Sequence, residues 1–221
     1  MKSLIIIPAF NESKNVPKLI ESINSYGYSY IVINDCSTDD SAELYQKLQI
    51  SHLDLPINLG LANVTQVGFK YAVEHGFDSA VVVDGDGQHL PAYIKPLLDK
   101  VSEGYDYVVG SRFLTEKKPV SMRMIGSRLI CFFIRLKTGR TVTDPTSGMR
   151  AMGRKVMKEF ADSLNYIAEP DALCHVLHEK MKFTEVQVRM EERQSGTSYF
   201  VNPMKSVKFM FNVLMSILFV Q

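Results

Sequence analysis

The chain has 221 residues, a formal net charge of +1 and 46% hydrophobic residues. This length and composition predict one compact α/β domain, and the near-neutral charge excludes a general nucleic-acid-binding protein, which would present a strongly basic face. Its three cysteines, Cys36, Cys131 and Cys174, lie far apart without C-x-x-C spacing, so neither a zinc site nor a disulfide framework is indicated and a reducing cytosol fits best.

The first predicted element is a buried strand over residues 3–7 that ends at Pro8. This apolar run is too short for a signal peptide. A helix is expected next, with Asn11 or Ser13 as its cap. Its apolar positions recur at three- and four-residue spacings: Val16, Leu19, Ile20 and Ile23.

The second predicted strand covers residues 30–33 and runs into the polar loop 34–41, followed by a helix containing Leu44 and Leu48. Strand, loop and helix therefore alternate twice. By the right-handed crossover rule, this alternation predicts neighbouring parallel strands whose loops gather on one edge of the sheet. Asp35 and Glu12 are expected near Asp84 for that reason.

The third predicted strand, residues 79–83, leads directly into Asp84-Gly85-Asp86-Gly87-Gln88-His89. Open α/β sheets bind ligands beyond the carboxyl ends of their strands, and Mg²⁺ prefers oxygen ligands shared with substrate phosphates. Asp84, Asp86 and Gln88 are therefore the candidate metal ligands. A solvated acidic turn is the alternative, because Gly and Asp dominate turns for conformational reasons.

Several short motifs in a fixed order now support a family resemblance. They are Pro8-Ala9-Phe10-Asn11-Glu12, Asn34-Asp35-Cys36-Ser37-Thr38-Asp39, Asn58-Leu59-Gly60, the Asp84–His89 segment with its D-x-D motif, Gly110-Ser111-Arg112, residues 144–150 and residues 193–198. The chain resembles the family 2 glycosyltransferases, and within them the polyprenyl-phosphate hexosyltransferases of the dolichyl-phosphate mannose synthase type. The resemblance implies a GT-A fold with a Rossmann-like, mostly parallel sheet, a nucleotide-sugar donor, Mg²⁺ or Mn²⁺, and an inverting transfer.

The resemblance also implies a donor site for a UDP- or GDP-hexose. Asp35 would accept from the base or ribose, Asp84 would lie near the ribose and metal, and His89 would support the site. The base and ribose pocket would be lined by Pro8, Ala9, Phe10 and Glu12. Each acidic residue has a structural alternative: Glu12 as a helix-dipole partner and Asp35 as an ordinary cap. Asn34 departs from the aspartate that many relatives carry.

The acceptor side depends on the chemistry of the acceptor. A polyprenyl phosphate is already an anion, so it needs cationic positioning, and Arg112 and Arg123 are the candidates because guanidinium binds phosphate bidentately. Asp144 would act as a base or as an orienting residue, with Glu169 as its rival. For Arg123, a charged helix face is the alternative.

A late loop is expected to fold over the diphosphate. Arg193 and Ser198 belong to this segment by resemblance. An ordinary exposed loop is the competing interpretation.

The C-terminal segment 203–221 is expected to form an apolar helix after a catalytic domain that spans residues 1–202. Lys205 and Lys208 precede an apolar run that is too short to span a bilayer, which needs about 20 apolar residues. This predicts a peripheral, interfacial helix at the cytoplasmic leaflet, with a helix packed on the domain as the alternative. Residues 129–136 form a second, rather continuously apolar stretch.

These observations predict a metal-dependent, inverting glycosyltransferase that moves a hexose to a polyprenyl phosphate at the membrane surface. The alternative acceptor is a hydroxyl of a lipid-linked or cell-surface glycan, for which Asp144 or Glu169 would be the base. A dinucleotide-binding protein is disfavoured because no G-x-G-x-x-G follows the first strand.

Overall fold

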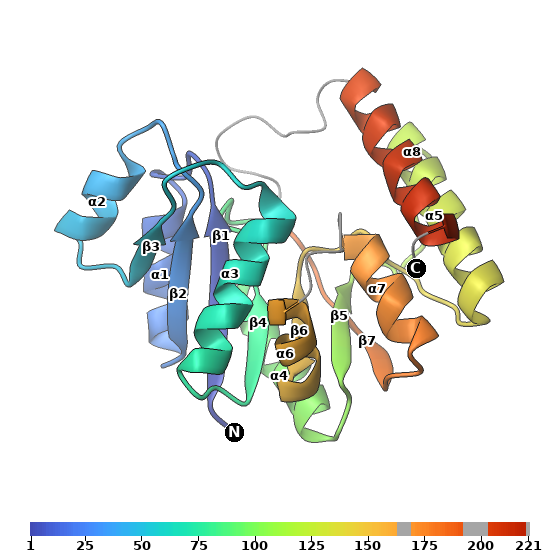
Figure 1. Cartoon of the computed structure of the whole chain (residues 1–221), viewed down its shortest axis with the longest axis horizontal. Helices are drawn as coiled ribbons and strands as arrows, with labels where there is room; N and C mark the ends of the chain where they lie inside the picture. The colour runs from blue at the N-terminus through green and yellow to red at the C-terminus, as the bar shows by residue number, and fades with distance from the viewer. Residues whose placement is uncertain (163–168, 192–202, 220–221) are drawn as a thin grey trace.

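The computed structural model describes residues 1–162, 169–191 and 203–219, and it contains a seven-stranded sheet with helices on both faces (Figure 1). The strand order is β3-β2-β1-β4-β6-β5-β7. Only β6 runs antiparallel to its neighbours, β4 and β5, among the strand pairs described. The strands are β1 (Ser3–Ala9), β2 (Ser29–Asn34), β3 (His52–Asp54), β4 (Ser79–Val82), β5 (Tyr107–Ser111), β6 (Arg150–Gly153) and β7 (Phe183–Gln187).

The central strands are apolar on both sides because both faces of the sheet are covered. In β1, Leu4 and Ile6 join one buried cluster, whereas Ile5 and Ile7 join the cluster on the opposite face. Alternate residues of a strand point to opposite faces, so a strand between two helical layers needs a continuous apolar run. The runs at residues 3–7 and 79–83 meet this requirement.

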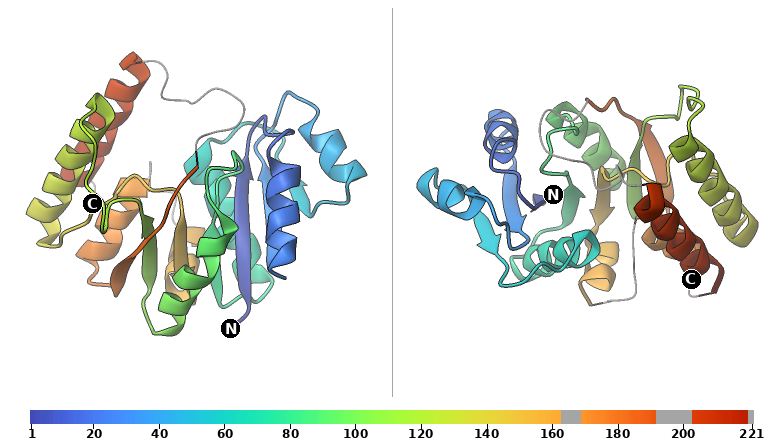
Figure 2. Two further views of the ribbon diagram at one scale, coloured as in Figure 1. Left: turned by 180° about the vertical axis from the view of Figure 1, so that it is seen from behind. Right: turned by 90° about the horizontal axis from the view of Figure 1, so that it is seen from above.

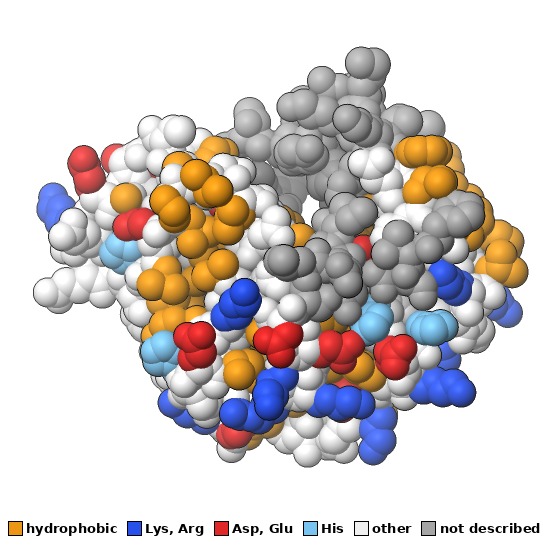
Figure 3. Space-filling model, viewed as in Figure 1, with side chains coloured by type: hydrophobic (Ala, Val, Ile, Leu, Met, Phe, Trp, Pro, Cys, Tyr) orange, Lys and Arg blue, Asp and Glu red, His pale blue; other side chains and the backbone are white. Residues whose placement is uncertain are grey.

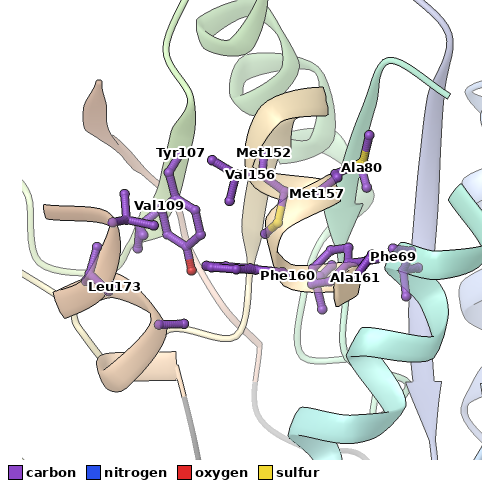
Figure 4. Close-up of a cluster of buried hydrophobic side chains, with 14 of the residues drawn as sticks. Phe69, Ala80, Tyr107, Val109, Met152, Val156, Met157, Phe160, Ala161 and Leu173 are labelled. Atoms are coloured by element: carbon purple, nitrogen blue, oxygen red, sulfur yellow. The ribbon is translucent and has the colours of Figure 1, made fainter. Parts of the chain in front are cut away.

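The helices form two layers (Figure 2). α1, α2 and α4 contribute to one cluster, whereas α3, α5, α6, α7 and α8 contribute to the other. In the second cluster, the Phe160 ring lies 6.1 Å from the Phe69 ring and 6.2 Å from the Tyr107 ring, which ties α3, α6 and β5 together (Figure 4). The helices are α1 (Val16–Ser25), α2 (Ser41–Lys47), α3 (Leu61–Glu74), the 3-10 turn η1 (Pro91–Tyr93), α4 (Ile94–Ser102), α5 (Met122–Thr138), α6 (Arg154–Asp162), α7 (Glu169–His178) and α8 (Pro203–Phe219).

Helices α5 and α8 lie side by side at one end of the molecule (Figures 1 and 2). Gly126 faces Met210 at this contact: a Cβ at position 126 would lie 2.1 Å from the Met210 sulfur, so a larger residue would displace the methionine side chain. The α8 end is held by Lys137, which donates to the Ile217 carbonyl at 2.6 Å, and by Ser216, which donates to the buried carboxylate of Asp171 at 2.8 Å. In the described part of the chain, every helix falls short of the length and apolarity needed to cross a membrane.

Two local expectations were wrong. Asn15, rather than Asn11 or Ser13, is the N-cap residue of α1. Asn11 has a φ of 57°, and its Oδ1 accepts from the Thr38 amide at 2.8 Å, so it joins two loops instead. Helix α2 ends at Lys47, which leaves Leu48 exposed.

Candidate active site

The polar loops expected to meet do so at one edge of the sheet. The loops after β1, β2, β4 and β5 leave the carboxyl ends of parallel strands, where open α/β sheets bind ligands. Because β6 is antiparallel, the segment that enters it, residues 144–149, reaches the same edge from the opposite direction. The loops after β1, β2 and β4 were expected at this edge from the alternation of strands and helices, whereas Arg112 and Asp144 were predicted for the acceptor side without a position in the sheet.

The end of β1 lies between the loop after β2 and the loop after β4, and it is hydrogen-bonded to both. Ala9 accepts from the Asp35 amide at 2.8 Å, and Pro8 accepts from the Gly85 amide at 3.2 Å. A Cβ at Gly85 would lie 3.1 Å from the Pro8 carbonyl oxygen, so a small residue is needed for this approach. Phe10 is exposed beside them, as a residue that contacts a ligand base can be.

Asp35 is buried and positions the loop that precedes α3. Its two carboxylate oxygens accept from the amides of Leu59 at 2.7 Å and Gly60 at 3.0 Å, and Gly60 has a φ of 78°. A carboxylate oxygen has two lone pairs, so these bonds leave acceptor capacity for a ligand. The loop 58–60 entered the prediction only as a family motif and had no site role, although its glycine was a signal for a close backbone approach.

Glu12 and Asn34 are both buried, and each makes a side-chain hydrogen bond. Glu12 accepts from the Asn15 side chain at 2.5 Å. The side-chain Nδ2 of Asn34 donates to Asp54 Oδ1 at 2.7 Å. An aspartate at position 34 would bring two carboxylates into contact, so the departure from the family pattern matches this chain's own Asp54.

The loop after β4 presents two carboxylates and an amide. The Asp84 amide donates to Nδ1 of His89 at 3.0 Å, which assigns the proton of the neutral ring to Nε2. Asp86 accepts from the Gln88 amide at 3.0 Å, and the Gln88 side chain donates to the Glu191 carbonyl at 3.1 Å. The buried His89 side chain therefore stabilises the conformation of this loop through its hydrogen bond with the Asp84 amide.

The donor set suits a cation that is shared with a substrate. Within the described residues, no group of three or more His, Cys, Asp and Glu side chains could hold a metal by itself. Asp84, Asp86 and the side-chain Oε1 of Gln88 are hard oxygen donors, and Mg²⁺ commonly takes one or two carboxylates plus substrate phosphates. The residues present fit such an incomplete site.

Gly148 brings the segment before β6 against the acidic loop. A Cβ at Gly148 would lie 2.4 Å from Asp84 Oδ2 and 3.1 Å from the His89 ring. Ser147 fixes the same turn by donating to the Gly110 carbonyl at 2.6 Å. Only glycine allows this contact without displacing the carboxylate.

Arg112 and Asp144 form a bidentate ion pair. The Arg112 Nε lies 2.6 Å from Oδ2 and its Nη2 lies 2.9 Å from Oδ1 of the fully buried Asp144 carboxylate. The Arg112 amide also donates to this carboxylate at 3.2 Å. The structure thus brings two predicted acceptor-side residues together as partners.

The side chains of four candidate residues lie outside the part of the chain that the structure describes. Arg123 lies in the first turn of α5 and Glu169 begins α7, but their side chains are outside the described part. Arg193 and Ser198 lie in residues 192–202, also outside it. The described chain before them ends at Glu191, whose amide donates to the Gln88 carbonyl at 2.9 Å.

The sheet order and the acidic edge loop define a glycosyltransferase of the GT-A fold. The chain belongs to glycosyl transferase family 2, whose family model matches residues 4–160. The family and fold expectations are thereby confirmed, and the protein is an enzyme that transfers a sugar.

Two curated relatives cover most of the chain. The UDP-N-acetylglucosamine–dolichyl-phosphate N-acetylglucosaminyltransferase of Methanococcus voltae is 27% identical over 96% of this chain and 94% of its own length. The polyprenol monophosphomannose synthase of Mycolicibacterium smegmatis is 27% identical over 89% of this chain and 80% of its own.

Solved structures share the fold at lower identity. Glucosyl-3-phosphoglycerate synthase from Mycobacterium tuberculosis, in complex with Mg²⁺ and uridine diphosphate, superposes with a TM-score of 0.73 at 17% identity, covering 98% of this chain and 79% of the other. Another structure of that enzyme contains Mn²⁺, uridine diphosphate and glucosyl-3-phosphoglycerate, with a TM-score of 0.71 at 17% identity and coverage of 98% and 78%.

Proposed function

We propose that this enzyme transfers a hexose from a nucleotide-diphosphate sugar to a polyprenyl phosphate, with a divalent cation and inversion at the anomeric carbon. The names of the curated relatives support the acceptor class. The observation that carries the proposal is the segment 144–149. Its Gly148 contacts the Asp84 carboxylate and its Asp144 holds the Arg112 guanidinium, so one short turn joins an anionic centre to a cationic one.

The donor would lie across the loops after β1, β2 and β4. Asp35 and the exposed Phe10 would contact the nucleoside, and Glu12 would support the same pocket. Asp84, Asp86 and Gln88 would hold the cation at the donor diphosphate. The bound cation would offset the negative charge that develops on the leaving nucleoside diphosphate.

The acceptor phosphate would lie at Arg112. In the proposed reaction an acceptor phosphate oxygen forms a bond to the anomeric carbon while the bond from that carbon to the nucleoside diphosphate breaks on the opposite face. Because the acceptor oxygen is already anionic, the step needs no strong base. Both oxygens of Asp144 accept from a cation, which favours the orienting role for Asp144 over proton abstraction. Arg123, Arg193 and Ser198 would add contacts to the phosphate groups.

The paired helices α5 and α8 would rest on the membrane surface. Hydrophobic side chains gather over this end of the molecule (Figure 3). On α5 the exposed apolar residues follow one helical stripe, with Phe132 at 59% and Leu136 at 68% exposure, and the basic Arg128 and Arg135 are exposed on the same helix. Apolar stripes with flanking basic residues favour anionic lipid interfaces. Among the residues of α5 and α8 whose side chains the structure describes, the large exposed apolar ones are Ile125, Leu129, Phe132, Leu136, Phe211, Met215 and Leu218.

The test is release of nucleoside diphosphate from UDP- and GDP-hexoses with Mg²⁺ or Mn²⁺, with and without polyprenyl phosphate in vesicles. Release stimulated by the lipid supports the proposal. Release that is stimulated by a glycan hydroxyl but not by polyprenyl phosphate would support the alternative acceptor instead. Loss of both turnover and metal-dependent donor binding would overturn the donor side as well.

A further inference from the structure

The edge strand β7 presents two polar side chains toward the acceptor side of the site. Glu185 and Gln187 are two residues apart, so they lie on the same face of the strand. Both make hydrogen bonds to loops that are distant in sequence. Neither residue belongs to a motif of the predicted site.

Glu185 holds the turn that carries Asp144. Its carboxylate accepts from the Thr143 amide at 2.9 Å, from the Asp144 amide at 3.1 Å and from the Thr143 hydroxyl at 3.0 Å. All three partners are donors, so the ionised carboxylate satisfies them without a proton of its own. The position of Asp144 therefore depends on an acceptor that comes from β7.

A chain of hydroxyl groups extends this hold to the end of β5. The Phe113 amide donates to Ser111 Oγ at 3.1 Å, and Ser111 Oγ lies 2.5 Å from Thr143 Oγ1. Because the Thr143 hydroxyl donates to Glu185, the Ser111 hydroxyl must donate to Thr143. The donors in this series of hydrogen bonds therefore all point the same way, and the last acceptor is the Glu185 carboxylate.

Gln187 holds the other side of the ion pair. Its Nε2 donates to the Arg112 carbonyl at 3.0 Å, and its Oε1 accepts from the Thr115 amide at 2.9 Å. The side-chain amide thus fixes the backbone on which the Arg112 guanidinium is mounted. Glu185 and Gln187 together fix both partners of the ion pair from one strand.

We propose that Glu185 and Gln187 are positioning residues for acceptor binding, which act by fixing the relative placement of Asp144 and Arg112. The inference rests on the proposed function, in which Arg112 receives the acceptor phosphate. It adds that the geometry of this phosphate site is set by β7, outside the family motifs. Burial raises the pKa of Glu185, while its hydrogen bonds from Thr143 and Asp144 oppose that rise, as a buried carboxylate surrounded by donors requires.

The test separates acceptor use from donor use in the full chain. Glu185→Ala removes the acceptor of three hydrogen bonds, so the KM for polyprenyl phosphate should rise about tenfold, while the KM for the donor stays within about twofold. Glu185→Gln retains an acceptor oxygen and should recover most of the loss. Glu103→Gln is the matched control, because it removes an exposed carboxylate that pairs only with Lys100 among the contacts described.

The outcomes are distinguishable. The inference would be overturned if Glu185→Ala raised the KM for the donor and the KM for polyprenyl phosphate equally and Glu185→Gln lowered the melting temperature. Glu185 would then only stabilise the fold. Unchanged acceptor kinetics in both Glu185 variants would overturn it too. A wild-type enzyme without lipid-stimulated release would instead refute the proposed function, and the acceptor role of β7 with it.

Discussion

The Arg112 guanidinium donates two hydrogen bonds, of 2.6 and 2.9 Å, to the Asp144 carboxylate, although the two residues are 32 positions apart in the sequence. Everything between them, including helix α5, leaves the sheet at one partner and returns at the other. The pair is therefore both a candidate phosphate site and the closure of a long chain segment, which we call the α5 segment (residues 112–144).

Arg112→Lys should weaken acceptor use more than donor use. Lysine keeps the positive charge but lacks the planar fork that matches a carboxylate or phosphate, so we expect the acceptor KM to rise by about tenfold. Steady-state kinetics against polyprenyl phosphate and against the donor would measure both. Arg140→Lys is the matched control because Arg140 is exposed. A lysine enzyme with wild-type acceptor kinetics would remove Arg112 from the phosphate site.

Arg112→Ala should also destabilise the protein, because it leaves the buried Asp144 carboxylate without its cation. Breaking a buried ion pair in this way costs about 3–5 kcal/mol. The double variant Arg112→Ala/Asp144→Ala should recover part of that loss in the free energy of unfolding, measured by denaturant titration. A double variant less stable than Arg112→Ala alone would contradict this account of the pair.

Asp86→Asn should abolish metal-dependent donor turnover. The amide oxygen is a weaker ligand than a carboxylate, and we expect kcat/KM to fall by at least about 100-fold. Binding of nucleoside diphosphate at increasing Mn²⁺ should lose its metal dependence in parallel. Asp99→Asn, which changes an exposed carboxylate bonded to Lys95, should behave as the wild type. Full metal dependence in Asp86→Asn would exclude Asp86 as a ligand.

Gly148→Ala should impair catalysis far more than folding. The new Cβ would meet Asp84 Oδ2 at 2.4 Å, so either the carboxylate or the turn must move. We expect kcat/KM to fall by about tenfold or more, since small displacements at a reacting centre are costly. Gly153→Ala is the control, because its nearest neighbour would be 3.6 Å away. Similar activities for the two variants would show that the Gly148 contact is not needed.

The pH dependence of stability should carry a contribution from Glu185. Its pKa is raised in the folded protein by burial, so the folded state binds this proton more tightly than the unfolded chain. The stabilising contribution is then present at low pH and is lost as the pH rises through the unfolded pKa toward the folded one. The stability difference, wild type minus Glu185→Gln, should therefore fall as the pH is raised across that range. The opposite slope would contradict a raised pKa.

The sequence predicts those site residues that lie in a loop immediately after a predicted strand. The apolar runs at residues 3–7 and 79–83 fix two central strands, and the loops after them contain Glu12 and Asp84. Contacts such as Gly148 with Asp84 and Glu185 with Thr143 could not be predicted, because they depend on an antiparallel strand and an edge strand that local patterns do not place. Asn34 is a similar case, since its partner Asp54 lies on a short strand that the predicted elements did not include.

The two ends of the α5 segment are held together by the Arg112–Asp144 ion pair and by the Ser111–Thr143 hydrogen bond beside it, so the length of the segment does not set the spacing of the strands. Because both ends meet at one point, insertions or deletions between them leave the spacing of β5 and β6 unchanged, and the entropy of closing a longer loop grows only slowly with length. Helix α5, which we propose lies at the membrane surface, can therefore change in length or sequence while the sheet edge that carries the candidate site keeps its dimensions.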